Sequence, residues 1–108
     1  MNFIEIATEF KNGSSGTDVF KKFSKDVFSL LETEGENGGM YFVVATAAKN
    51  YYLNFEDQAV GEEFTIESKN IITDFNDRII FALTSSPEIK LKVTSELASN
   101  YHWHTDKF

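Results

Sequence analysis

The chain contains no cysteine, a single proline and no long apolar run. Without cysteine it has no disulfide, no thiolate ligand for zinc and no cysteine nucleophile, which suits a reducing compartment. No stretch approaches the ~20 apolar residues of a membrane-spanning helix, and the N-terminus lacks the basic and apolar regions of a signal peptide. We therefore expect a cytoplasmic protein that does not act on membranes.

Basic residues are also scarce. Ten lysines and arginines stand against 17 aspartates and glutamates, and the formal net charge is −7. A field of this sign repels phosphate, so direct binding to nucleic acid is not expected. The one basic cluster, at Lys21, Lys22 and Lys25, is typical of a solvated helix face.

Apolar residues, by contrast, are plentiful. The 108 residues are 42% hydrophobic and 15% aromatic, with 11 phenylalanines. This composition supplies enough apolar surface to offset the entropy of ordering one domain, and the length leaves no room for a second core. We predict a single globular domain over residues 1–108.

The first third of the chain predicts two helices. Apolar side chains recur at helical spacing over residues 2–10 and again over residues 20–31. Ser15 or Thr17 is the expected cap of the second helix. The glycine-rich segment 35–39 predicts its end.

Past Gly39 the sequence favours strands, because β-branched and aromatic residues come in short runs between turn residues. The predicted strands cover residues 41–47, 51–55, 63–67, 70–75, 78–84 and 89–93. A short C-terminal helix is expected from Ser95 to about Tyr101. The predicted fold class is α+β, with two N-terminal helices packed on an antiparallel meander of about five or six strands.

A mostly helical second half is the alternative. Ile72, Phe75 and Ile79 also lie at helical spacing, and Ser86-Pro87 is a plausible helix start. Short apolar runs cannot be assigned from their period alone, so this alternative stays open.

His102 and His104 are candidate metal ligands. On a strand both imidazoles lie on one face, with Asp106 continuing the alternation. The spacing is permissive rather than specific, and histidines near a terminus are more often surface residues. We expect no metal, no cofactor and no assigned catalytic residue.

The acidic excess is concentrated in the middle of the chain. Nine of the 17 carboxylates lie from Asp26 to Glu67 with one base, Lys49, among them. This segment therefore carries −8 (nine acids, one base) and the rest of the chain +1. A concentrated field of one sign is a feature through which a protein attracts a partner of the opposite sign.

We interpret the carboxylate-rich segment as the binding surface of a small interaction protein. The expected partner is a basic protein, such as a nucleic-acid-binding enzyme, and the role that of an inhibitor, immunity factor or nucleic-acid mimic. On a strand, same-face carboxylates two residues apart stand about 6.6 to 6.8 Å from one another, roughly twice the 3.4 Å axial rise of phosphates in one DNA strand. The predicted partner-binding residues are Glu32, Glu34, Glu36, Glu56, Asp57, Glu62, Glu63 and Glu67.

Three other interpretations remain open. In the first interpretation, the acidic residues only keep the protein soluble. The second is a small α+β ligand-binding domain or enzyme with an aromatic-lined pocket, in which His102, His104 or a buried aspartate acts as general acid or base. The third is an oligomeric structural protein, a homodimer among others, joined through strand edges. The aromatic residues considered for the pocket are Tyr41, Phe42, Tyr51, Tyr52, Phe55 and Phe64.

Overall fold

The computed structural model describes residues 1–108 and contains helices but no strand. The predicted α+β fold is therefore wrong. None of the helices is both long and apolar enough to cross a lipid bilayer. The α-helices are α1 (Phe3–Asn12), α2 (Thr17–Leu30), α3 (Gly38–Phe55), α4 (Glu62–Leu83) and α5 (Pro87–Trp103), and the short 3-10 helices are η1 (Gly35–Asn37) and η2 (Thr105–Lys107).

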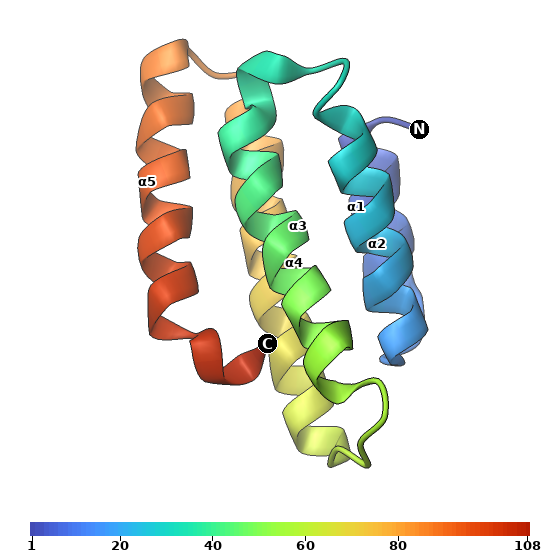
Figure 1. Cartoon of the computed structure of the whole chain (residues 1–108). Coiled ribbons are helices and arrows are strands. Elements are labelled where there is room, and N and C mark those ends of the chain that lie inside the picture. Colours follow the sequence, from blue (N-terminus) through green and yellow to red (C-terminus); the bar gives the residue numbers. More distant parts are fainter.

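The helices form two layers. Figure 1 shows α3 between α2 and α5 in the front layer, with α1 behind α2 and α4 behind α3. The helix α3 contacts α2, α4 and α5, and its most extensive contact is with α2. The helix α1 is held between α2 and α4. All five α-helices contribute buried side chains to one hydrophobic core.

The central position of α3 follows from its sequence. Its 18 residues include a single charged side chain, Lys49. A helix that is apolar around most of its circumference is most stable in the interior. Alanines on the side facing α2 permit a close approach, and Ser24 of α2 donates a hydrogen bond of 2.9 Å to the carbonyl oxygen of Ala45.

Aromatic pairs fill the space around α3. The rings of Phe20 and Tyr51 stack with centroids 3.9 Å apart, and those of Phe3 and Tyr41 stack at 5.1 Å. Each pair joins α3 to one of the N-terminal helices. Such pairs contribute about 0.5 to 1.5 kcal/mol beyond the burial of their surface.

Residues 41–47 and 51–55, which were predicted as strands, belong to α3. Tyr, Phe and Val favour strands locally, but strand and helix propensities yield to tertiary packing. The buried positions of the segment include Tyr41, Val44 and Ala48, three and four residues apart. This is the helical period, and it lines the side of α3 that faces the core.

The second half of the chain is helical, as in the alternative interpretation, and the strands predicted over 63–93 are wrong. Ile72, Phe75 and Ile79 are buried on one side of α4. Ser86 caps α5 by accepting a hydrogen bond from the backbone N–H of Ile89, and Pro87 occupies the first helical position. The predicted C-terminal helix lies inside α5, which begins eight residues before Ser95.

The two N-terminal helices begin differently. Asn2 and Glu5 form a capping box at the start of α1, a reciprocal pair of side-chain bonds to the backbone. Gly16 occupies the N-cap of α2 and no side chain bonds there, so the predicted cap at Ser15 or Thr17 is wrong.

Lys69 of α4 donates hydrogen bonds of 2.6 and 2.8 Å to the carbonyl oxygens of Gly13 and Ser14, and so ties α4 to the end of α1.

One polar side chain of the core has no partner. Asn76 of α4 is 2% exposed, and neither its amide nitrogen nor its amide oxygen makes a hydrogen bond. Its neighbours one turn away on the helix, Ile72 and Ile79, are fully buried. A buried polar group without a partner costs about 1 to 3 kcal/mol.

Replacing this side chain with an apolar one should stabilise the protein. We expect Asn76→Ala to raise the free energy of unfolding by about 1 kcal/mol, since the unpaired amide is removed and only a small space is left. Urea unfolding measures the change. Asn70→Ala, an exposed position of the same helix, reports the gain from helix propensity alone; an equal effect at both positions would contradict the prediction.

Candidate functional site

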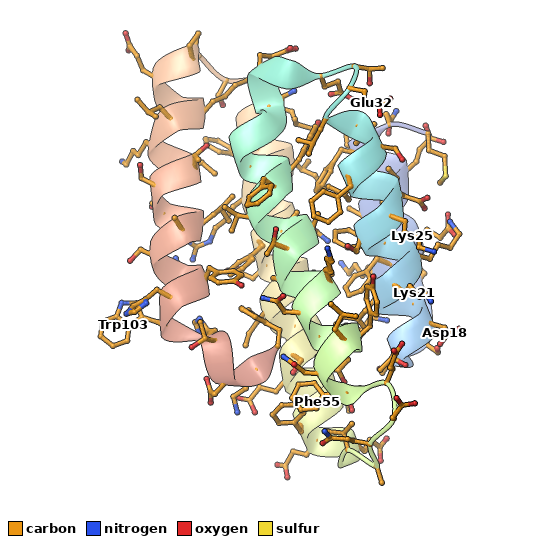
Figure 2. All side chains as sticks on the ribbon, viewed as in Figure 1. Asp18, Lys21, Lys25, Glu32, Phe55 and Trp103 are labelled. Atoms are coloured by element: carbon orange, nitrogen blue, oxygen red, sulfur yellow. The ribbon has the colours of Figure 1, made fainter.

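The eight predicted binding residues do not lie on one surface. Glu32, Glu34 and Glu36 form an upper acidic cluster in the connection between α2 and α3. Figure 2 places Glu32 and Phe55, the last residue of α3, at opposite ends of the molecule. The 18 residues of α3 separate the two ends by about 27 Å, at 1.5 Å per helical residue. The lower acidic cluster, around the connection from α3 to α4, consists of Glu56, Asp57, Glu62, Glu63 and Glu67.

In the upper acidic cluster, Glu34 has a structural role that the sequence did not reveal. Its Oε1 accepts hydrogen bonds from the hydroxyl of Tyr41 at 2.8 Å and from Nδ2 of Asn37 at 3.3 Å. Tyr41 is fully buried. Burial, and next the hydrogen bond to Glu34, raise the pKa of the Tyr41 hydroxyl well above its usual range. Glu34 therefore links the connection to the core.

Removal of this carboxylate should destabilise the fold. We expect Glu34→Ala to lower the free energy of unfolding by about 1 to 3 kcal/mol, since it leaves a buried hydroxyl unpaired. Glu32→Ala, an exposed carboxylate in the same connection, is the matched control and should change stability by less than about 0.5 kcal/mol. Urea unfolding measures both. Equal losses of unfolding free energy in the two variants would contradict the structural role of Glu34.

The raised pKa of Tyr41 also predicts an effect of alkaline pH. An unfolded tyrosine ionises near pH 10, while Tyr41 in the folded chain keeps its proton to higher pH. The contribution of the Tyr41 hydroxyl to stability is fully present below about pH 10 and is lost as the pH rises above it. Tyr41→Phe should lack this loss, so the stability difference between wild type and Y41F should narrow from pH 9 to pH 11.5 in urea unfolding. A constant difference would contradict the prediction.

The lower acidic cluster is exposed and largely unpaired. No base lies in the sequence between Lys49 and Lys69. Of its five carboxylates only Glu67 forms an ion pair, with Nζ of Lys107 at 3.2 Å. Lys107 is itself anchored, since its carbonyl oxygen accepts a hydrogen bond of 2.7 Å from Ser68. The other four carboxylates are free to meet cations from outside the molecule.

Part of this cluster also serves the fold. Glu62 and Glu63 occupy the first turn of α4, where the helix dipole favours negative charge. The acidic row continues along the exposed side of α4 through Asp74 and Asp77. On the helix, Glu63 and Glu67 are about 6 Å apart along the axis, and not the roughly 13 Å of the predicted strand.

A groove follows the seam between α4 and α5. Its lower hollow, of about 570 Å³, is lined by residues of both helices and by His104. A second hollow, of about 470 Å³, lies further along the same two helices between Phe81 and Val93. The carboxylates that line the two hollows are Glu63, Glu67, Asp74, Asp77 and Glu96. Sequence reasoning missed this groove because the two helices were predicted as strands.

His102 and His104 do not have the strand geometry on which the metal hypothesis depended. His102 is an exposed residue at the end of α5, and His104 follows the helix. Nδ1 of His104 donates to the carbonyl oxygen of Asn100 at 2.8 Å, because a carbonyl oxygen only accepts. No group of three or more histidines, aspartates or glutamates in the structure is placed to hold a metal ion.

Five of the six aromatic residues considered for a pocket pack in or against the core instead. Tyr41 and Tyr51 are buried, and the rings of Phe55 and Phe64 pack edge to face with centroids 5.2 Å apart. Phe42 is exposed on α3. These side chains do not line a common cavity.

The basic side of the molecule is α2. Lys22 bridges Glu9 at 2.9 Å and Asp26 at 2.8 Å, and its bonds first to Asp26 and then to Glu9 raise its pKa. Lys21 and Lys25, labelled on α2 in Figure 2, are exposed and form no ion pair, and Nζ of Lys21 lies 5.7 Å from the centroid of the Tyr52 ring. They extend the solvated face predicted from the sequence.

Comparison of the chain with protein families, curated proteins and solved structures found no match. Function is therefore argued from the geometry and charge of this molecule.

Proposed function

We propose that this chain is a small interaction protein that binds a basic partner protein through the lower acidic cluster. The partner presents lysines and arginines, as a nucleic-acid-binding enzyme does, and the chain acts as an inhibitor, immunity factor or nucleic-acid mimic. We place this role in the cytoplasm, where a chain without cysteine needs no disulfide. The proposed surface is narrower than the one predicted from sequence, because the upper cluster lies at the other end of α3.

The observation that supports this proposal is the set of exposed carboxylates without internal partners. Glu56, Asp57, Glu62 and Glu63 lie within eight residues of the chain and none forms an ion pair. Like charges held close together repel one another, and a cationic partner relieves that repulsion. The gain is larger for a partner that arrives with several cations on one surface.

The acidic row on α4 extends the negative surface that a phosphate-binding partner would meet. From Glu63 to Asp77 its four carboxylates extend over about 21 Å, at axial intervals of about 6, 10.5 and 4.5 Å. The row therefore offers a basic groove a line of negative charges, without the even spacing of phosphates in a DNA strand.

The upper acidic cluster is a weaker candidate. Glu34 is engaged with Tyr41 and Asn37, which leaves Glu32 and Glu36 as its free carboxylates. Lys21 and Lys25 also lie on the helix that leads to this end. The alternative of an oligomer joined through strand edges has no basis, since the structure contains no strands.

The proposal is tested with two matched pairs of charge reversals. Glu56→Lys/Asp57→Lys alters the lower cluster, and Glu32→Lys/Glu36→Lys alters the upper one by the same charge. Each protein serves as bait in an extract of the source organism at about 50 mM salt, and bound proteins are eluted with a salt gradient. We expect a basic protein to be retained by wild type and by the upper variant, and at least tenfold less by the lower variant.

Three results would contradict the proposal. The first is that the upper variant loses the partner as fully as the lower variant does. The others are that all three baits retain the partner equally, or that none retains a basic protein. Circular dichroism of each variant shows that its helices are intact, so a loss of binding is assigned to the charges.

A further inference from the structure

The groove between α4 and α5 has the length and lining of a helix-binding site. Its two hollows extend along α4 from Glu63 to Phe81, which is about 27 Å at 1.5 Å per residue. Its accessible apolar lining consists of Ile66, Ile71 and Phe81, and the buried Phe75 and Val93 lie beneath it. A peptide helix of about 18 residues matches this length.

Apolar anchors stand at both ends of the groove. Ile66 is 45% exposed beside the lower hollow, and Phe81 is 64% exposed beside the upper one. Nothing in the molecule covers them. An amphipathic helix that lies in such a groove buries its apolar residues against side chains of this kind.

Charge decides which helix the groove accepts. Five carboxylates line the two hollows, against two basic side chains, Arg78 and His104. Two of these carboxylates have cationic neighbours, Asp74 with Arg78 at 3.1 Å and Glu67 with Lys107 at 3.2 Å. Both carboxylates are more than half exposed, so these pairs are weak and exchange readily with a cation from a ligand.

We propose that the groove between α4 and α5 binds a basic amphipathic helix, with its apolar face on Ile66, Ile71 and Phe81 and its lysines or arginines beside the carboxylates on the rims. This inference rests on the proposed function, since it specifies which element of the basic partner is bound. The lysine-rich helix α2 of a second copy of this chain does not fit the groove. This helix has its apolar side, including Phe20, Phe23 and Val27, buried in the core.

The test uses two synthetic peptides of about 18 residues with the same leucine and lysine content. One has its leucines on a single helical face, and the other has them scattered around the helix. Each is titrated at low salt into the isotope-labelled protein, and backbone amide shifts are followed by NMR. We expect the first peptide to bind at least tenfold more tightly than the second and to shift amides of α4 and α5.

Two double variants locate the site. Ile66→Ala/Phe81→Ala removes the anchors of the groove, and Phe42→Ala/Leu53→Ala removes two side chains of α3 that are 56% and 55% exposed. We expect the first pair to weaken binding of the amphipathic peptide at least tenfold and the second less than twofold. All four positions are exposed, so the fold should tolerate either pair. The inference would be overturned if both double variants lost the same binding affinity, or if the peptide with scattered leucines bound as tightly as the amphipathic one. Amide shifts centred on α2 would also overturn it.

The same variants separate this inference from the proposed function. A natural basic partner that depends on Glu56 and Asp57 but binds I66A/F81A as tightly as wild type would leave the proposed function standing and exclude the groove. Peptide binding in the groove, combined with no basic partner retained from the extract, would leave the groove standing and exclude the proposed function.

Discussion

The burial of α3 is the constraint on which the rest of the structure depends. This helix carries one charged residue in 18, contacts α2, α4 and α5, and buries seven of its residues, Tyr41 and Tyr51 among them. A fully buried large apolar side chain contributes about 1.5 to 3 kcal/mol. Charged residues are excluded from such a helix, because an unpaired charge in the interior is far more costly than any single apolar contact is favourable.

The distribution of acids follows from that exclusion. The carboxylates that precede and follow α3 in sequence are held at its two ends, with the length of the helix between them. Each end uses one carboxylate internally: Glu34 accepts from the buried Tyr41, and Glu67 pairs with Lys107 of the C-terminal segment. The remaining acids are left at the surface. The same packing that forms the core therefore divides one acidic segment into two surfaces.

Stability and recognition share residues at the lower end. Glu62 and Glu63 favour the start of α4 through the helix dipole, and they also belong to the surface proposed to meet a basic partner. The groove above them leaves Ile66 and Phe81 uncovered. A bound helix would give these side chains the apolar contacts that the chain itself does not supply.

Several features could be predicted from the sequence because they depend on local spacing or on charge counts. Ile6 and Phe10 of α1 lie on a helical period, Ser86-Pro87 is a local helix start, and the concentration of acids between Asp26 and Glu67 is a count. The helix α3 could not be predicted in this way. Tyr, Phe and Val favour strands by less than about 1 kcal/mol per residue, and only burial against neighbouring helices reverses that preference.

The sequence by itself determined the size of the apolar core, the helical period of its first third and the position of the acidic segment along the chain. Only the tertiary structure decided that residues 41–55 form the central helix, that Glu34 faces Tyr41, and that the acids divide into two clusters with a groove beside one of them. The physical reason is that these features depend on contacts between residues distant in sequence. Their energies exceed the local preferences that a sequence pattern reports.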